Sequence, residues 1–260
     1  MSVREQYLQA LGVEVWKART GSPPPLAEAG VAMAAAVAAA PAAVVAAPAV
    51  AAPPVAAPPV AAPAVAAIAA DEAAWEALRA QVSTCTHCEL SQTRTQTVFG
   101  VGNRRADLMV IGEAPGADED RQGEPFVGRA GQLLNSMLRA IGYARQTLYI
   151  ANVLKCRPPG NREPKPAEVA CCLPYLQQQL DMIQPRLLVA VGRVAAQNLL
   201  ATDTPLARLR GQVHRFGARA TPLIVTYHPA YLLRSPTEKR KSWVDLKFIR
   251  AELAGARAGA

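Results

Sequence analysis

The amino-acid sequence predicts an α/β fold, in which a three-layer α/β/α domain surrounds a central, mainly parallel four-stranded sheet. From residue 107 onward, short continuous apolar runs alternate with segments of helical periodicity. Such runs are typical of parallel strands that are buried on both faces. Residues 31–70 consist almost wholly of Ala, Pro and Val and carry no charged side chain, so they supply little that can pack a core. The 190 residues after this stretch, 71–260, suffice for one domain with a sizeable core.

The region before residue 71 divides into a short helix and a linker. Residues 4–18 have the apolar spacing of one helical face. A helix of this length is marginal alone in water, so residues 1–20 either dock onto the main domain or bind a protein partner. Residues 21–70 are predicted to be a disordered Ala/Pro/Val-rich linker, because they cannot bury enough surface to fold. The prolines that interrupt this stretch also exclude it as a membrane span, and we expect no membrane contact.

The predicted domain spans residues 71–260, and its first helix is expected to start near Asp71, a residue type that caps helix N-termini. Apolar runs predict the strands 107–112, 148–154, 186–192 and 222–228. Amphipathic patterns predict the helices 130–142, 166–183, 193–200 and 235–253. Because ligands of such sheets bind at the carboxyl ends of the strands, the residues of interest lie at 113–116, 152–157, 192 and 228–234.

Charge and cysteine content bound the function. The chain has 28 Lys and Arg against 20 Asp and Glu, and the whole net charge of +8 falls on residues 71–260. An excess of this sign favours a polyanionic partner. The N-terminus lacks a basic segment followed by an apolar one, so we expect a cytoplasmic protein, which we also take to be a monomer. Disulfides are not expected in that compartment, and the five cysteines need another explanation.

Four cysteines have the spacing of a thiolate metal site. Cys85 and Cys88 form a C-x2-C pair, and Cys156 and Cys172 follow at a distance. A pair of this kind can hold one ion or cluster while the two distant cysteines complete the site. The spacing does not distinguish zinc from an iron–sulfur cluster. The alternative is that the cysteines of the 166–183 helix are small buried residues and the pair is accidental.

Two loops after predicted strands carry candidate binding residues. The loop over 112–134 is rich in glycine and contains Phe126, whose ring could stack on a flat heterocycle or anchor the loop to the core. His228 directly follows the last strand, and a lone His in such a position is either structural or catalytic. Leucine and arginine after it could act as a wedge and a clamp on a duplex, or form a docked loop. These residues are Leu232, Leu233 and Arg234, and the candidates for further phosphate contacts are Lys239, Arg240 and Lys241.

Taken together, the motifs are similar to those of one enzyme family. The segments GEAPG, PFVGRAGQLL, YIANVLKCRPPGNREP, CLPYL and HPAYLLR follow the C-x2-C pair in this order. In combination they resemble the family 4 uracil-DNA glycosylases, the iron–sulfur branch of that superfamily, over roughly residues 71–260. The resemblance implies a uracil-DNA glycosylase-like fold. It also implies base excision repair, in which uracil is flipped out of DNA and its N-glycosidic bond is hydrolysed.

The resemblance also implies roles for individual residues. Phe126 would stack on the flipped uracil, Asn152 would read its Watson–Crick edge, and Ala114 would contact it through its backbone. His228 would donate a hydrogen bond to O2, while Glu113 or Glu119 would supply negative charge near the sugar and orient water. A [4Fe-4S] cluster would be held by Cys85, Cys88, Cys156 and Cys172. Cys172 rather than Cys171 matches, because it lies two residues before a proline.

Two other functions would fit parts of the same sequence. One superfamily branch traps its product covalently through a His in a basic loop, but the corresponding segment here, 155–166, contains no His. The other alternative is an iron–sulfur DNA-binding accessory protein of replication without glycosylase activity. Such a protein would share the basic charge and the cysteines. DNA binding alone, however, does not require Phe126, Asn152 and His228 together.

Overall fold

The computed structural model describes residues 62–258 and, apart from these, residue 6. The predicted helix over 4–18 and the linker as far as residue 61 therefore lie outside the described residues. The helices are α2 (Ala62–Ser83), α3 (Ala117–Gln122), α4 (Arg129–Ala140), α5 (Pro166–Ile183), α6 (Arg193–Leu200), α7 (Leu206–Leu209), α8 (Pro229–Arg234) and α9 (Lys239–Ala258). Short 3-10 helices are η1 (Glu89–Gln92), η2 (Arg145–Thr147), η3 (Pro159–Asn161) and η4 (Pro236–Glu238). The strands are β1 (Val101–Gly102), β2 (Leu108–Gly112), β3 (Tyr149–Asn152), β4 (Leu187–Val191), β5 (His214–Phe216) and β6 (Thr221–Thr226).

The sheet confirms the predicted parallel core and extends it at both edges. Its strand order is β1-β3-β2-β4-β6-β5. The four central strands β3, β2, β4 and β6 are parallel, and they are the four that the apolar runs predict. The edge strands β1 and β5 pair antiparallel to their neighbours and were not predicted. They have two and three residues, too few for a periodic signal.

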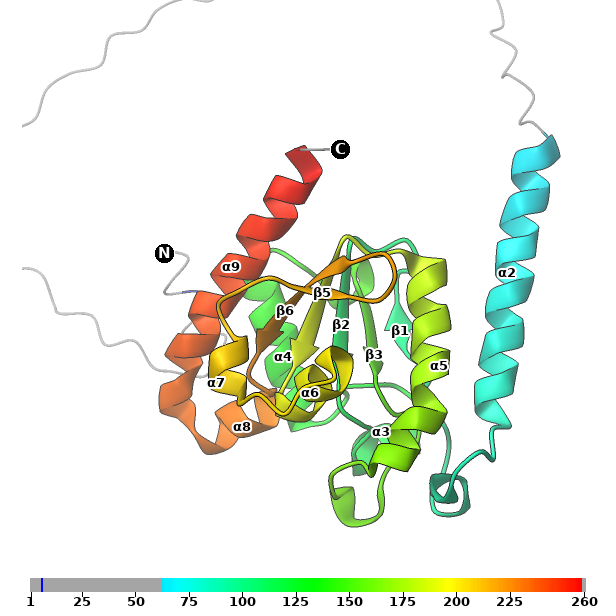
Figure 1. Ribbon diagram of the computed structural model, residues 1–260, viewed down its shortest axis with the longest axis horizontal. Helices are drawn as coiled ribbons and strands as arrows, with labels where there is room; N and C mark the ends of the chain where they lie inside the picture. The colour runs from blue at the N-terminus through cyan, green and yellow to red at the C-terminus, as the bar shows by residue number, and fades with distance from the viewer. Residues whose placement is uncertain (1–5, 7–61, 259–260) are drawn as a thin grey trace, which may run out of the picture.

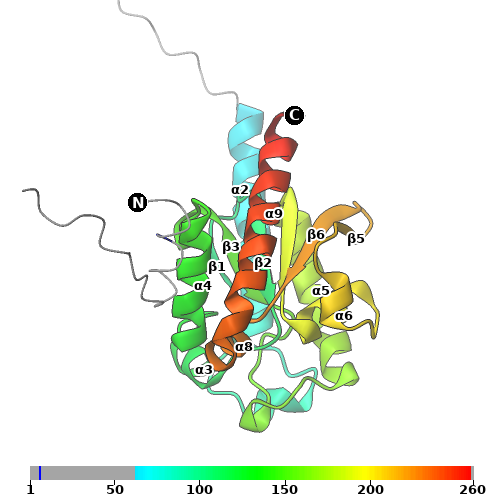
Figure 2. The same ribbon diagram turned by 90° about the vertical axis from the view of Figure 1, so that its left-hand side faces the viewer.

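Helices cover both faces of the sheet, as expected for three layers (Figures 1 and 2). Alternate residues of the central strands point to opposite faces, so each strand contributes to two separate apolar clusters. On one face the strands pack with residues from α2, α5, α6 and α7. On the other they pack with residues from α4, α8 and α9. None of the helices in the described part of the chain is long and apolar enough to cross a lipid bilayer.

Helix α2 begins at Ala62, nine residues before the predicted start near Asp71, so the predicted linker 21–70 runs too far toward the C-terminus. Alanine is the strongest helix former, and a proline is tolerated in a first helical turn, so the Ala-rich sequence continues the helix backward. The C-terminal half of α2 packs against α5. Trp75 is buried there, with its ring 5.3 Å from that of Phe99 and 5.6 Å from that of Tyr149. This helix therefore belongs to the domain.

The basic helix predicted over 235–253 is shorter at its start and longer at its end. The chain after β6 first forms α8, then the 3-10 turn η4, and only then α9 from Lys239. Ser235 has φ −128° and ψ 73°, which ends α8, and Pro236 starts η4. The chain thus changes direction beside the carboxyl end of β6. Helix α8, between β6 and this turn, lies at the edge of a pocket.

Candidate active site

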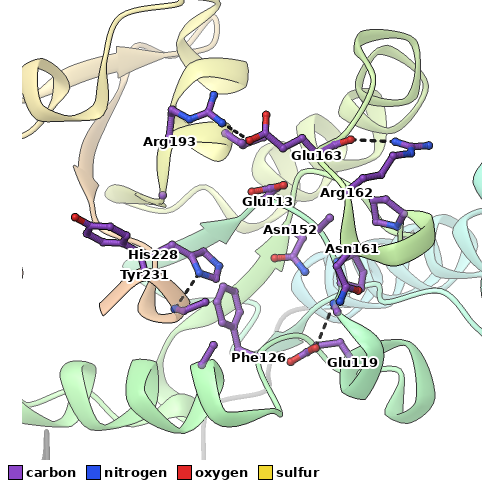
Figure 3. A pocket seen from close by; sticks show the side chains of 18 of the residues that line it. Glu113, Glu119, Phe126, Asn152, Asn161, Arg162, Glu163, Arg193, His228 and Tyr231 are labelled. Carbon is purple, nitrogen blue, oxygen red and sulfur yellow. Dashed lines mark hydrogen bonds and ion pairs between the residues drawn. The ribbon is translucent and has the colours of Figure 1, made fainter. Parts of the chain in front are cut away.

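A pocket of about 680 Å³ opens at the carboxyl ends of the parallel strands, where the sequence predicts the ligand crevice. It is lined by residues from the loops after β2, β3, β4 and β6, which lie far apart in the chain (Figure 3). The predicted site residues among them are Glu113, Ala114, Glu119, Phe126, Asn152, His228 and Arg234. The fold therefore brings together in one pocket residues that the sequence spreads over more than a hundred positions.

Asn152 is the last residue of β3, and its side chain is only 2% exposed. Its Oδ1 atom is buried and accepts no hydrogen bond from any residue of the described chain. The neighbouring residue across the ladder is Gly112, at which a Cβ atom would lie 2.4 Å from this Oδ1 and 2.6 Å from Cζ of Phe126. An unpaired buried acceptor is costly unless another molecule supplies a donor.

Lys155 holds the backbone of Asn152 in place through a hydrogen bond to its carbonyl oxygen. Its ammonium group is fully buried and donates to the Asn152 carbonyl oxygen at 3.1 Å, to Oε1 of Gln179 at 2.6 Å and to the Phe99 carbonyl oxygen at 3.3 Å. Burial lowers the pKa of Lys155 to about 7. These three acceptors join the end of β3 to α5 and to the segment before β1. The backbone of Asn152 is therefore fixed by contacts outside the sheet as well as within it.

Phe126 lies in a left-handed backbone conformation, with φ 55°, and its ring is buried at the pocket wall. This conformation is rare for an aromatic residue and needs support from its surroundings. Arg145 supplies part of it by donating to the carbonyl oxygens of Pro125 at 2.5 Å and Phe126 at 3.3 Å. Gly131 supplies another part, because a Cβ atom there would lie 1.8 Å from the Phe126 carbonyl oxygen.

Glu119 supports the same loop and is already engaged by backbone groups. One carboxylate oxygen accepts from the amides of Val127 at 2.9 Å and Gly128 at 3.1 Å, and the other accepts from Gly116 at 3.2 Å. These bonds hold the two ends of the Phe126 loop together. The structure therefore gives Glu119 a loop-shaping role that the sequence did not indicate.

Glu113 directly follows β2 and lines the pocket. Its pKa is raised to about 7, mainly by burial and to a smaller extent by the charge of Glu163, while the charge of Arg193 opposes the rise. Glu163 and Arg193 form an ion pair at the pocket wall (Figure 3). A carboxyl group with this pKa can change its protonation state near neutral pH.

His228 caps the N-terminus of α8, and this contact fixes which ring nitrogen carries the proton. Its Nδ1 accepts a hydrogen bond from the backbone amide of Ala230 at 3.1 Å. The neutral ring must then carry its proton on Nε2. Burial lowers the pKa of His228 to about 4, and the charge of Arg234 adds to this effect while that of Glu119 opposes it. The imidazole is thus neutral at physiological pH, and it lies 5.8 Å from the Phe126 ring.

Comparison with known proteins matches this arrangement to one family. The family model described as the uracil DNA glycosylase superfamily matches residues 99–248, which include Glu113, Phe126, Asn152 and His228. The chain belongs to the uracil DNA glycosylase superfamily. It is 46% identical to the type-4 uracil-DNA glycosylase of Archaeoglobus fulgidus over 182 residues, which cover 67% of this chain and 90% of that protein.

Further relatives place the chain in the type-4 family of the superfamily. The type-4 uracil-DNA glycosylase of Thermotoga maritima is 41% identical over 166 residues, which cover 63% of this chain and 85% of that protein. A type-5 uracil-DNA glycosylase of Pyrobaculum aerophilum is 32% identical over 148 residues, covering 50% of this chain and 64% of that protein. The resemblance read from the sequence motifs is thereby confirmed.

In this member of the superfamily, the four predicted cysteines gather beside one apolar cluster. Cys156 and Cys172 are buried in it, and Cys85 and Cys88 pack against it half-buried. Burial raises the pKa of Cys156, and the charges of Cys88 and Cys85 also raise it, so these thiols lie within electrostatic range of one another. Within the described chain, no three His, Cys, Asp or Glu side chains are arranged around a single metal ion.

Cys171 and Arg94 complete the surroundings of these thiols. The Cys171 thiol donates to the carbonyl oxygen of His87 at 3.4 Å, and Cys171 is close enough to Cys88 to raise its pKa. Arg94 donates to Sγ of Cys156 at 3.0 Å, a contact that favours a thiolate there. Burial raises the pKa of Cys172 to about 11, so a cation is needed if this buried thiol is to ionise.

The predicted DNA-binding residues are divided between the interior and the surface. Leu232 has no exposed surface and packs in the core, so its prediction as a wedge is wrong: a helix turns this position inward. Leu233 is 37% exposed, and Arg234 and Arg240 are exposed, while Lys239 is half-buried. Sequence reasoning assigned no role to other residues of the pocket wall, among them Asn161, Arg162, Glu163, Arg193 and Tyr231. Arg193 had a signal, because it follows the carboxyl end of a predicted strand.

Proposed function

We propose that the protein is a DNA repair glycosylase that takes uracil from DNA into this pocket and hydrolyses its N-glycosidic bond, leaving an abasic site and free uracil. The observation that carries the proposal is the buried Oδ1 atom of Asn152, which lacks a protein donor beside the Phe126 ring. The names of the type-4 relatives support it. A base within the duplex stack cannot reach such a site, so the nucleotide must be flipped out.

Asn152 and Phe126 select the base. A side-chain amide can accept from N3–H of uracil through Oδ1 and donate to O4 through its NH2 group. Cytosine presents an acceptor and a donor in the reverse order, so the same amide discriminates against it. Phe126 offers a ring for stacking. Ala114 lines the same wall, and we assign it a backbone contact with the base.

His228 and Glu113 act on the bond that breaks. Cleavage of N1–C1′ leaves the electron pair on uracil, so negative charge grows on O2 while the sugar becomes oxocarbenium-like. The Nε2–H group of neutral His228 donates to O2 and stabilises that charge. The ionised Glu113 stabilises the sugar cation and accepts a proton from the water that adds to C1′. Uracil departs as an anion and takes a proton from solvent.

Basic and apolar side chains around the pocket hold the DNA. Arg234 lines the pocket and is exposed, and α9 begins with Lys239, Arg240 and Lys241. We assign these side chains to phosphate contacts, which supply most of the affinity for DNA without reading its sequence. Of the two leucines predicted as a wedge, Leu233 is exposed beside Arg234, and we assign it to contact with the bases around the flipped nucleotide.

A [4Fe-4S] cluster is the cofactor that the cysteines fit. Cys85, Cys88, Cys156 and Cys172 come from three segments, pack against one apolar cluster and interact electrostatically, as thiolate ligands of one cluster would. When bound, the cluster would cross-link these segments and contribute folding energy. The chemistry at the sugar uses none of these residues.

The cluster assignment is tested by metal analysis of protein purified without oxygen, which should contain about four iron and four sulfide per chain. Cys156→Ala should lose the iron and sulfide, while Cys171→Ser should keep them. Stoichiometric zinc would contradict the assignment.

The function is tested with an oligonucleotide that contains a single uracil, followed by alkaline cleavage at abasic sites. Wild-type protein should cleave it, and Asn152→Asp should release uracil much more slowly and admit cytosine, because a carboxylate accepts from the amino group of cytosine but cannot donate to O4. Absence of uracil release by the wild type would favour a DNA-binding accessory protein. Full uracil activity of Asn152→Asp would place the pocket elsewhere.

A further inference from the structure

Tyr231 is a large side chain exposed at the rim of the pocket, and the catalytic scheme does not use it. It lies on α8 three residues after His228, lines the pocket and is 36% exposed. In Figure 3 it lies beside His228, on the side away from Phe126. The neighbouring Leu232 is buried in the core, so the orientation of α8 is fixed and Tyr231 is held on its outer side.

The ring of Tyr231 is held by a stack that reaches into the core. It lies parallel to the Tyr227 ring, with centroids 5.2 Å apart and an angle of 23° between the planes. The Arg210 guanidinium lies 4.3 Å from the centroid of Tyr227. Both faces of an aromatic ring can stack, and one face of Tyr231 is occupied by Tyr227. The exposed area of Tyr231 is thus left for a flat partner.

Arg210 is itself anchored rigidly. It makes two hydrogen bonds of 2.8 Å to the carboxylate of Asp245, which is 2% exposed, and donates to the Lys241 carbonyl oxygen at 2.9 Å. Asp245 also accepts from the Thr226 hydroxyl at 2.8 Å. A buried bidentate pair has little freedom, so the stack above it is ordered before any ligand arrives. Preorganised aromatic rings bind at a low entropic cost.

We propose that Tyr231 is a stacking platform for the nucleobase adjacent to the flipped uracil in the same strand. The inference rests on the proposed function, since it places uracil in the pocket whose rim Tyr231 forms. Flipping removes one stacking neighbour from the adjacent base and exposes its face. An exposed aromatic ring can replace that neighbour, and it tolerates any sequence because every base has a π-face. Arg234, exposed on the same helix, would hold the phosphate backbone beside it.

The test compares oligonucleotides in which the nucleotide on the 5′ or the 3′ side of uracil either keeps its base or carries a baseless analogue. For the wild type, loss of the base on one side should weaken binding roughly 5- to 100-fold, the effect of one base–aromatic stack. Tyr231→Ala should bind the intact substrate as weakly as the wild type binds the baseless one, and it should lose nothing further on the baseless one. Tyr231→Phe should behave as the wild type, because the ring remains.

Two controls, a variant away from the pocket and uracil release by the wild type, separate a failure of this inference from a failure of the proposed function. Val244 is 58% exposed on α9 and does not line the pocket, so Val244→Ala should match the wild type on every substrate. Equal losses of Tyr231→Ala on intact and baseless substrates, with unchanged circular dichroism, would show that the ring acts only by packing on Tyr227 and would overturn the platform. Uracil release by the wild type from the intact oligonucleotide tests the function independently of either result.

Discussion

The positions of the Asn152 and Phe126 side chains both depend on Gly112, because a Cβ atom there would collide with each of them. The two side chains reach the space above this glycine from different elements, so the proposed reading of uracil and the proposed stacking on it both depend on one position in the sheet. His228 depends on another local feature, the amide of Ala230, which donates to Nδ1 and leaves the proton of the neutral ring on Nε2. The roles proposed for Asn152 and His228 thus follow from the atoms that their protein contacts leave unused, which are Oδ1 of Asn152 and Nε2 of His228.

His228→Ala should slow the single-turnover rate by about 10²–10³, or ~2.7–4 kcal/mol, because the hydrogen bond to O2 strengthens only as charge develops. Binding of DNA should change little, since phosphate contacts supply most of it. Rapid-quench measurement at saturating protein separates the two quantities. Arg240→Gln is the matched control, which should weaken binding and lower its salt slope by about one while it leaves that rate unchanged. Equal losses of rate and affinity in His228→Ala would return this residue to a structural role.

The rate should also depend on the protonation of Glu113. Its pKa is raised to about 7, and the ionised form is the one that we propose to stabilise the sugar cation and activate water. The single-turnover rate should therefore rise with pH through neutrality and level off above it. Glu163→Gln removes a neighbouring negative charge, which should shift the midpoint to lower pH without removing the transition. A pH–rate series on the wild type, Glu163→Gln and Glu113→Gln checks this. A midpoint that persists in Glu113→Gln would assign the titration to another group.

At the scale of elements, the loop between β2 and α4 is shaped by residues that do not touch the base. Glu119 and Arg145 bind the backbone on either side of Phe126 and hold it in a conformation that costs roughly 1–3 kcal/mol. The sequence could not show this role of Glu119, because its partners are backbone amides up to nine residues away. It could not show which leucine of HPAYLLR faces the core either, because that depends on the angle at which α8 leaves β6.

Glu119→Gln should therefore act on the loop rather than on the chemistry. An amide cannot replace all three accepted hydrogen bonds, and bonds to a charged group are worth about 1.5–3 kcal/mol each, so the free energy of unfolding should fall by a similar amount. The affinity for uracil-containing DNA should fall with it, while the rate at saturation should stay within a few-fold. Urea denaturation and single-turnover kinetics measure these effects. Asp118→Asn, on the exposed side of the same helix, should change neither, and a total loss of rate in Glu119→Gln would restore it as a catalytic carboxylate.

At the scale of the whole molecule, the sequence predicts the four central strands well because each is a continuous apolar run that both helical layers bury. Helices such as α5 and α6 were also predicted at their observed limits, since their periodicity and start signals agree. The start of α2 was predicted nine residues too late. The Ala-rich composition before Asp71 suits a linker as well as a helix, and it carries no apolar periodicity that would distinguish the two.

Two truncations test this boundary. Deletion of residues 1–61 should leave uracil excision on short oligonucleotides within a few-fold of the full chain, because every residue to which we assign a role in binding or catalysis comes after this segment. Deletion of residues 1–83 should unfold or strongly destabilise the protein, since it removes the buried Trp75, Leu78 and Val82, and each such side chain contributes about 1.5–3 kcal/mol. Thermal melting of both proteins checks this. A stable, active 84–260 fragment would show that α2 is dispensable.

The two short edge strands that the sequence did not reveal affect how the molecule behaves at high concentration. An exposed sheet edge is a template on which another chain can add a strand, and long edges are a common route to aggregation. Here the parallel strands, whose apolar runs would be the most hazardous to expose, are all internal. The edges offer only two residues of β1 and three of β5, with Arg215 exposed at the centre of the latter. The fold thus shields its most aggregation-prone segments behind edges too short to recruit a neighbouring chain.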